Sequence, residues 1–129
     1  MSQAFSTQDQ PAPIPGDVSV LSLILPKIEQ AMESLVNYSS MGPVYWRQLK
    51  VDLIARGLQG EQRYGRPLET KNGRDALIDW YQEAIDGLMY AFQAEAEEKG
   101  SPKEEIYQEL LTLQLTLTIA ITKLLVDRG

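Results

Sequence analysis

Acidic side chains recur along one edge of a predicted helix in the second half of the chain. At about 100° per residue, Asp75, Asp79, Glu83 and Asp86 share less than a quarter-turn. Like charges one turn apart destabilise a helix by about 0.2–0.5 kcal/mol per pair, and a bound divalent cation would turn this repulsion into ligation. The pattern therefore indicates a metal site. Glu83 and Asp86 form an E-x-x-D pair one turn apart, and Asp79 is a third candidate ligand.

A cationic, turn-rich segment precedes this acidic edge. Arg63, Lys71 and Arg74 lie in or beside it. Cations there could bind phosphates while the acids hold a metal, which is the division of labour that phosphoryl chemistry needs. We expect Asn72 to be the N-cap of the acidic helix, so that Asn72 and Arg74 lie where free backbone N–H groups favour anions. A solvated acidic face is the alternative, and it remains open.

A second polar stripe follows one side of the preceding predicted helix. Asp52 could complete the metal site, and Arg56 and Arg63 could bind phosphate oxygens. An ordinary i,i+4 surface pair between Asp52 and Arg56 explains the stripe equally well. The stripe consists of Gln48, Asp52, Arg56, Gln59 and Arg63.

Composition narrows the chemistry that the chain can perform. The 129 residues include no cysteine and no histidine, and the net charge is −6. Thiolate and imidazole ligands, a Ser-His-Asp triad and a His-containing di-iron site are therefore excluded. A metal would be held by oxygen ligands, which favour Mg²⁺ or Mn²⁺. The acidic balance argues against nucleic acid as a partner.

Gly, Pro and Asn divide the chain into a proline-containing polar tail at residues 1–16 and one all-helical domain at residues 17–129. We expect the first helix to begin at Val18 or Pro26, with its more secure part after Leu25, because proline is tolerated in a first turn. Its apolar positions are Ile24, Ile28, Met32 and Leu35. The expected helices are Val18 or Pro26 to Tyr38, Val44–Tyr64, Arg74–Glu98 and Pro102–Arg128.

The last segment alternates apolar and polar residues as a strand would. Its length and the capping-box pattern of Ser101, Pro102 and Glu104 favour a helix. As a helix it would be apolar on nearly every side and would need cover on every side. We therefore expect a homo-oligomer. The absence of a signal-peptide pattern and of an uncharged apolar run of about 18 residues predicts a cytoplasmic protein without a membrane partner.

Three short motifs resemble a known family. Tyr64–Leu68 reads Tyr-Gly-Arg-Pro-Leu, Asn72–Leu77 reads Asn-Gly-Arg-Asp-Ala-Leu, and Tyr81–Asp86 reads Tyr-Gln-Glu-Ala-Ile-Asp. Together they are similar to the MazG-like all-α nucleoside triphosphate pyrophosphohydrolases, in particular a compact phage-encoded branch. Residues 52–90, about a third of the chain, carry the resemblance.

The resemblance implies a four-helix MazG-like bundle assembled into a homodimer or homotetramer. It implies hydrolysis of a (d)NTP to the monophosphate and pyrophosphate with Mg²⁺ or Mn²⁺, on purine deoxynucleotides such as dGTP or dATP, in phage nucleotide-pool metabolism. Glu83 and Asp86 carry over as the E-x-x-D metal ligands. The family's upstream E-E-x-x-E motif is missing, and only Asp52 lies on the corresponding stripe. The number of metal ions therefore stays open.

The resulting hypothesis assigns Glu83, Asp86 and Asp79 to catalysis and metal binding, with Asp52 as a further metal ligand. Substrate phosphates would bind to Arg56, Arg63, Lys71, Asn72 and Arg74. Tyr64, Trp80 and Tyr90 are candidates for stacking on the base, although aromatic residues on such helices are more often core. A non-catalytic helical interaction or regulatory module is the alternative. A phosphatase acting on another metabolite would differ by releasing orthophosphate.

Overall fold

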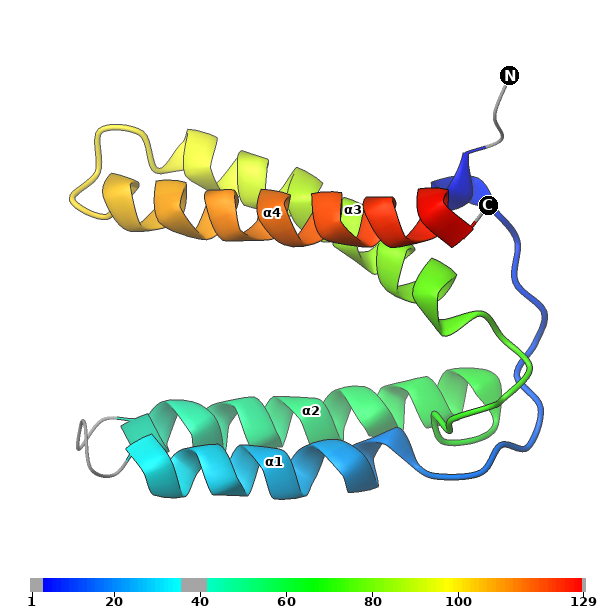
Figure 1. Ribbon diagram of the computed structural model, residues 1–129. Helices are drawn as coiled ribbons and strands as arrows, with labels where there is room; N and C mark the ends of the chain where they lie inside the picture. Colours follow the sequence, from blue (N-terminus) through cyan, green and yellow to red (C-terminus); the bar gives the residue numbers. More distant parts are fainter. Residues whose placement is uncertain (1–3, 36–41, 129) are drawn as a thin grey trace. The chain divides into compact units, whose positions relative to one another are not determined.

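The computed structural model describes residues 4–35 and 42–128, and every regular element in them is helical (Figure 1). The all-α prediction is confirmed for these residues. A single antiparallel bridge between Ser19 and Glu69 does not extend into a strand. The elements are a short 3-10 helix η1 (Phe5–Thr7) and the four α-helices α1 (Val20–Leu35), α2 (Gly42–Tyr64), α3 (Ala76–Glu97) and α4 (Glu104–Arg128).

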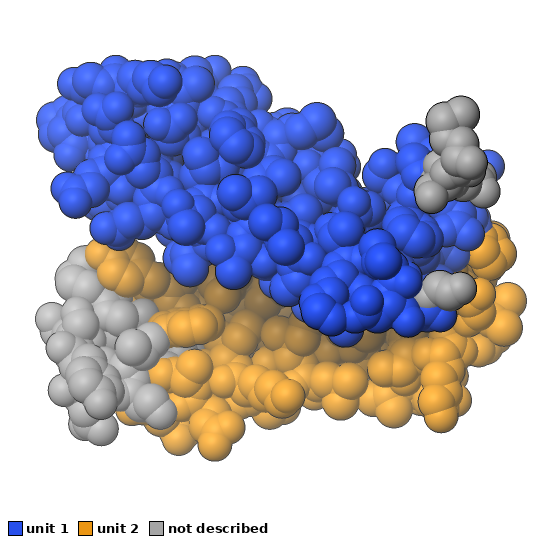
Figure 2. All heavy atoms as spheres, turned by 45° about the horizontal axis from the view of Figure 1, so that its top comes forward, with its two compact units in different colours: residues 1–10, 75–129 blue, residues 11–74 orange. Residues whose placement is uncertain are grey.

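The chain divides into two compact units (Figure 2). Unit 1 contains η1, α3 and α4, with residues 1–10 and 75–129. Unit 2 contains α1 and α2, with residues 11–74. The boundary that the sequence suggested at residue 16 lies within unit 2.

In unit 2, the polypeptide before α1 runs beside the loop after α2. Asp17 N–H donates to the Thr70 carbonyl, and Thr70 N–H donates to the Val18 carbonyl, both at 2.8 Å. Gly16 permits this approach, since a Cβ built on it would lie 2.1 Å from the Thr70 carbonyl oxygen. Residues 11–16, expected to be part of a flexible tail, thus make defined contacts. Two further backbone hydrogen bonds flank this pair: Ile14 N–H donates to the Asn72 carbonyl, and Val20 N–H donates to the Leu68 carbonyl.

The start of α1 differs from the expectation. The helix begins at Val20, close to the earlier of the two expected starts, and includes Pro26 in its interior, so a start at Pro26 is wrong. Pro26 removes one helical hydrogen bond, while the backbone bond from Val20 to Leu68 anchors the first turn from outside. Ile28 is buried, as expected. Tyr38 and the side chains of Met32 and Leu35 lie outside the described residues.

In unit 1, α3 and α4 form a hairpin around a small core. Ile78, Ala84, Ile121 and Leu125 are buried together. Phe5 from η1 meets the Tyr81 ring edge-on, with ring centroids 6.4 Å apart. This contact attaches the beginning of the chain to α3, where the sequence suggested a tail.

A polar contact aligns the two helices of this hairpin. Gln114 of α4 donates from Nε2 to the Ala84 carbonyl of α3 at 3.2 Å. Gly87 leaves room for it, because a Cβ there would lie 3.1 Å from the same nitrogen. The unfavourable glycine in the middle of α3 therefore has a packing reason.

The helix prediction for the last segment is confirmed, with a later start. α4 begins at Glu104 and not at Pro102. Ser101 Oγ accepts from Lys103 N–H at 3.1 Å, and Glu104 Oε2 accepts from Gly100 N–H at 3.1 Å. Both side chains thus accept from backbone N–H groups, as their types predict. The Glu104 carboxylate accepts from the N–H of Gly100, whereas in a standard capping box it would accept from the N–H of the N-cap residue Ser101.

Much of the apolar surface of α4 is exposed. Of the helices in the described residues, α4 is the one that is long and apolar enough to cross a membrane, judged by length and composition alone. Of its most apolar stretch, 17% is buried. A core helix of a soluble protein meets the same criteria. The large exposed apolar residues of α4 are Ile106, Leu110, Leu113, Leu115, Leu117, Ile119, Leu124 and Val126.

Candidate functional site

The acidic edge of α3 is open to solvent over its second half. Glu83 and Asp86 are exposed, and Asp79 is half-buried. Within residues 4–35 and 42–128, neither Glu83 nor Asp86 has a hydrogen bond or ion pair through its side chain. No three acidic side chains of this part of the chain come close enough together to form a metal site. The edge therefore offers a carboxylate pair that could supply part of a ligand set.

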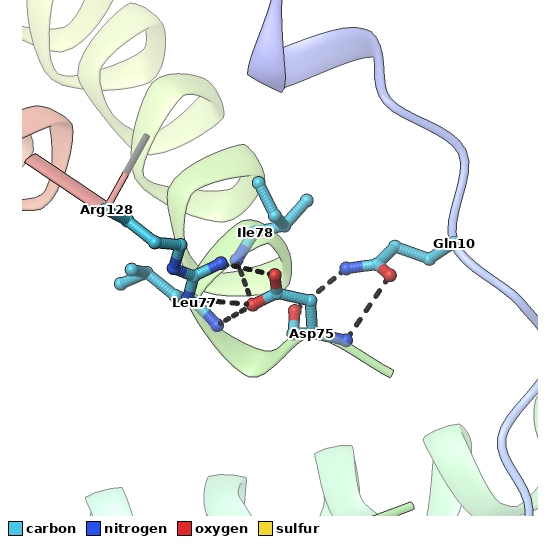
Figure 3. Close-up of polar contacts among 5 residues, drawn as sticks. All are labelled: Gln10, Asp75, Leu77, Ile78 and Arg128. Carbon is cyan, nitrogen blue, oxygen red and sulfur yellow. Dashed lines mark hydrogen bonds and ion pairs between the residues drawn. The ribbon is translucent and has the colours of Figure 1, made fainter. Parts of the chain in front are cut away.

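Asp75, the first acid of the predicted edge, has a structural role instead (Figure 3). It is the N-cap of α3, and its Oδ1 accepts from Leu77 N–H at 3.1 Å and from Ile78 N–H at 3.3 Å. The assignment of Asn72 as N-cap is therefore wrong. Because Asp75 precedes the helix, the acidic edge consists of Asp79, Glu83 and Asp86.

Two distant residues hold this cap in place. Arg128, the last residue of α4, binds both carboxylate oxygens of Asp75 through Nη1 and Nη2. The hydrogen bond from Arg128 lowers the pKa of Asp75 below its ordinary value, the backbone N–H groups of the cap lower it further, and burial acts in the opposite direction. Gln10 donates from Nε2 to the Asp75 carbonyl at 2.8 Å and accepts from Asp75 N–H at 3.3 Å. The start of α3 is thus fixed from both ends of unit 1.

The loop between α2 and α3 turns sharply at the Asn-Gly-Arg motif. Lys71 and Gly73 have positive φ angles of 54° and 83°, and glycine adopts this conformation without the penalty that a Cβ imposes. Asn72 between them is buried, and its Oδ1 accepts from Arg74 N–H at 3.2 Å. Asn72 therefore shapes the loop, and its side-chain oxygen is not directed to a helix end.

This turn returns Arg74 to the end of α2. The Arg74 guanidinium carbon lies 5.9 Å from the centroid of the Tyr64 ring, and that of Arg63 lies 5.2 Å from the same centroid. Arg74 Nη1 also donates to the Pro11 carbonyl at 2.6 Å. Two of the predicted phosphate-binding cations thus gather on one aromatic side chain.

The other predicted site residues of unit 2 are exposed and make surface contacts. Arg56 donates to Gln59 Oε1 at 2.6 Å, which is an ordinary contact along α2. Lys71 lies 3.5 Å from an Asp17 carboxylate oxygen. Asp52 accepts from Gln48 at 3.1 Å. These contacts are weak enough to be exchanged for a ligand, and they do not by themselves form a site.

The predicted site residues are distributed between the two units. Asp79, Glu83 and Asp86 belong to unit 1, whereas Asp52 and the five predicted phosphate-binding residues belong to unit 2. Each group is defined within its own unit. Sequence reasoning missed the arginine-binding role of Tyr64, the Pro11 carbonyl that holds Arg74, and the arginine–carboxylate pair on Asp75. Only the Tyr-Gly and Asn-Gly turn signals hinted that the chain would double back there.

No protein-family model, curated protein or solved structure showed a significant match to this chain.

Proposed function

We propose that this protein is a metal-dependent nucleoside triphosphate pyrophosphohydrolase with a MazG-like bundle, converting a (d)NTP and water to the (d)NMP and pyrophosphate. The observation that carries the proposal is the solvent-facing pair Glu83 and Asp86, which makes no ion pair with the described residues. Two adjacent carboxylates without counter-charges repel each other, and a divalent cation is the simplest partner for them. Purine deoxynucleotides are the proposed substrates, in phage nucleotide-pool metabolism, and the cytoplasm is the proposed location.

The carboxylate pair fits Mg²⁺ or Mn²⁺ as a partial ligand set. Mg²⁺ usually keeps several waters and is held by one or two carboxylates together with substrate phosphates. Glu83 and Asp86 would be these ligands, with Asp79 and Asp52 as candidates for the remaining positions. The metal would supply charge neutralisation of the phosphates and a more acidic bound water.

The protein's own residues would bind and orient the triphosphate. Arg63 and Arg74 are the first candidates for phosphate contacts, because a guanidinium matches the geometry of phosphate oxygens. Arg56 and Lys71, both exposed, are secondary candidates. A carboxylate of the acidic edge that is not engaged with metal would accept the proton of the attacking water.

We also propose that the active form is a homodimer or homotetramer. α4 is long and apolar, and 17% of its most apolar stretch is buried. Exposed apolar surface of this extent on a helix favours association. A second copy of the chain is the proposed cover, with its acidic edge available to complete a shared site.

The decisive experiment is a panel of dNTPs and NTPs incubated with Mg²⁺ or Mn²⁺, with chromatographic detection of monophosphate and a separate assay for pyrophosphate. We expect both products in equal amounts. Orthophosphate in place of pyrophosphate would indicate a phosphatase. No product from any nucleotide would favour the non-catalytic helical module, for which α4 would be the interaction surface.

Variants then test the metal ligands. Glu83→Gln and Asp86→Asn should each lower kcat at least about a hundredfold and weaken Mn²⁺ binding in calorimetry, while helical content stays unchanged. Glu109→Gln is the matched control, since Glu109 is an exposed acid on α4 of the same hairpin. Full activity of the Asp86→Asn variant would defeat the metal assignment.

A further inference from the structure

Two rows of residues follow α4 with the same spacing, and only one of them faces α3. The first row, in steps of three and four residues, includes the buried Thr118, Ile121 and Leu125. The second row, the outer seam, is exposed, and its five large members are between 40% and 66% exposed. Alternating steps of three and four residues are the pattern by which one helix packs against another, so the outer seam fits a helix. It consists of Ile106, Leu110, Leu113, Leu117, Ala120 and Leu124.

The position of the outer seam on α4 suits a second neighbouring helix. The seam lies roughly a quarter-turn around α4 from the row that faces α3. A helix at the corner of a four-helix bundle contacts its two neighbours through rows separated in this way. Beside the seam, α3 and α4 border a hollow of about 410 Å³, lined by Ala91 and Ala94 of α3 and by seam residues of α4. The small side chains of α3 leave room there for side chains of an added helix.

The charges beside the outer seam indicate which helix fits it. One flank carries Glu109, Thr116 and Lys123 at steps of seven residues, with the acid near the start of α4 and the base near its end. Such flanking charges set the partner and the direction of a helix pair. Two antiparallel copies of α4 would place Glu109 of each copy beside Lys123 of the partner subunit. A parallel pair would bring Lys123 near Arg128 of the partner subunit, which has the same charge.

We propose that α4 pairs along the outer seam with α4 of a second copy of this chain, in antiparallel direction and around a two-fold axis. The proposal rests on the association through α4 that is part of the proposed function, and it is independent of hydrolysis. It adds the side of the helix, the direction and the register. The seam residues then face each other in pairs that share residue 115 as their midpoint: Ile106 with Leu124, Leu110 with Ala120, and Leu113 with Leu117.

The same register serves the flanking charges. Glu109 and Lys123 have residue 116 as their midpoint, within one residue of the midpoint of the seam pairs. Both side chains are exposed. Lys123 forms an ion pair with Asp127 in the single chain, and both partners of this pair are exposed. Exposed pairs of this kind contribute little, so Lys123 can exchange Asp127 for Glu109 of the partner subunit at small cost.

The direction of pairing is tested with introduced cysteines, because the chain contains none. Ile106→Cys and Leu124→Cys are made singly and together in the full-length chain. In the proposed register, the two copies of residue 106 lie about 27 Å apart along the axis, and so do the two copies of residue 124. A disulfide needs Cα atoms within about 7 Å. After oxidation, non-reducing electrophoresis should show at least about tenfold more covalent dimer for the double variant than for either single variant.

Charge variants test the flank of the seam, with association measured by sedimentation and helical content by circular dichroism. Lys123→Glu should raise the dissociation constant about tenfold, because two repulsive contacts replace two attractive ones. Adding Glu109→Lys should restore association to within about threefold of the unmodified protein. Glu109→Gln alone creates no repulsion and should change the dissociation constant by no more than about threefold. Lys99→Glu makes the same charge change in the loop before α4 and should stay within about twofold.

The proposal is overturned if the unmodified chain is monomeric at the concentrations used for cross-linking, even if that monomer binds lipid vesicles through α4. It is also overturned if either single cysteine variant cross-links as well as the double variant, which would indicate a parallel pair. Failure of the added Glu109→Lys to restore a folded Lys123→Glu variant would remove the charge contacts and the register with them. A tetramer with the expected cross-links supports the proposal, since a separate apolar row on α4 contains Leu115, Ile119 and Val126.

These outcomes are separable from those that test the enzyme. The expected cross-links without nucleotide hydrolysis would defeat the enzyme and leave the antiparallel pair standing. Hydrolysis by a monomer, or by an oligomer whose single cysteine variants cross-link, would do the reverse.

Discussion

Asp75 should contribute measurably to stability, because one side chain both caps α3 and binds the end of α4. We expect Asp75→Ala to lower the free energy of unfolding by about 1.5 kcal/mol at pH 7. Loss of the two cap hydrogen bonds accounts for about 1 kcal/mol. The ion pair with Arg128 adds about 0.5 kcal/mol, a low value because the two side chains are 37% and 49% exposed.

Matched variants divide this effect into its two parts. Asp75→Asn keeps a good N-cap and should lose only the ion-pair part, about 0.5 kcal/mol. Arg128→Gln should lose a similar amount, and its effect should vanish in the Asp75→Asn background. Urea unfolding followed by far-UV circular dichroism, at one fixed protein concentration, measures the unmodified protein, the three single variants and the double variant. Equal losses for Asp75→Ala and Asp75→Asn would refute the assignment of the cap as the larger part.

The same residue predicts a pH dependence with a defined sign. The folded-state pKa of Asp75 is lowered from 3.8, so the unfolded chain takes up the proton first as the pH falls. The stabilisation is therefore fully present above about pH 4 and is lost as the pH drops through the folded-state pKa. The difference in unfolding free energy between the unmodified protein and Asp75→Ala should shrink between pH 5 and pH 2. A difference that stays constant or grows over this range would contradict the reasoning.

Three further predictions follow from packing. Gly87→Leu should destabilise the α3–α4 hairpin by about 1–3 kcal/mol in urea unfolding, because the side chain would displace Gln114. Gly87→Ala should stay within about 1 kcal/mol of the unmodified protein, since the gain in helix propensity offsets the tight contact. Equal effects of the two substitutions would contradict the packing argument. Gly16→Ala should lower the free energy of unfolding by about 1–3 kcal/mol, because its Cβ would overlap the Thr70 carbonyl. It should also speed the exchange of the backbone amide hydrogens of Asp17 and Thr70. Unchanged exchange at these two amides would show that this contact does not hold the loop. Leu113 is 66% exposed in the single chain. If a second copy of the chain covers α4, Leu113→Glu should lower the mass of the oligomer measured by light scattering. An oligomer of unaltered mass would mean that Leu113 lies outside the interface.

Sequence patterns were most informative about features that lie within a single helix. The capping residues Ser101 and Glu104 predicted a helix start before an ambiguous apolar segment, and α4 is a helix. The carboxylates of α3 share one edge because helical geometry requires it. The position of the first helix could not be read in the same way. Pro26 left a start before it or at it open, and in the structure the backbone bond from Val20 to Leu68 joins the first turn to the loop after α2.

The N-cap of α3 shows the limit of local reasoning for the candidate site. Asn72 and Asp75 are both good N-cap types, and the sequence around them favours neither strongly. The choice is made by Gln10 and Arg128, which contact Asp75 from distant parts of the chain, and by the positive φ of Gly73, which keeps Asn72 outside the helix.

The sequence by itself determined the helical class, the absence of thiol and imidazole side chains, and the single acidic edge of α3. These properties depend on residue types and on spacings within one or two helical turns, which a linear chain already contains. Only the tertiary structure decided that Asp75 leaves the acidic edge to become a cap, and that Arg74 joins Arg63 on Tyr64. Such contacts join residues far apart in the chain, and the entropy lost in bringing them together is offset only by the combined backbone and side-chain bonds of the folded units.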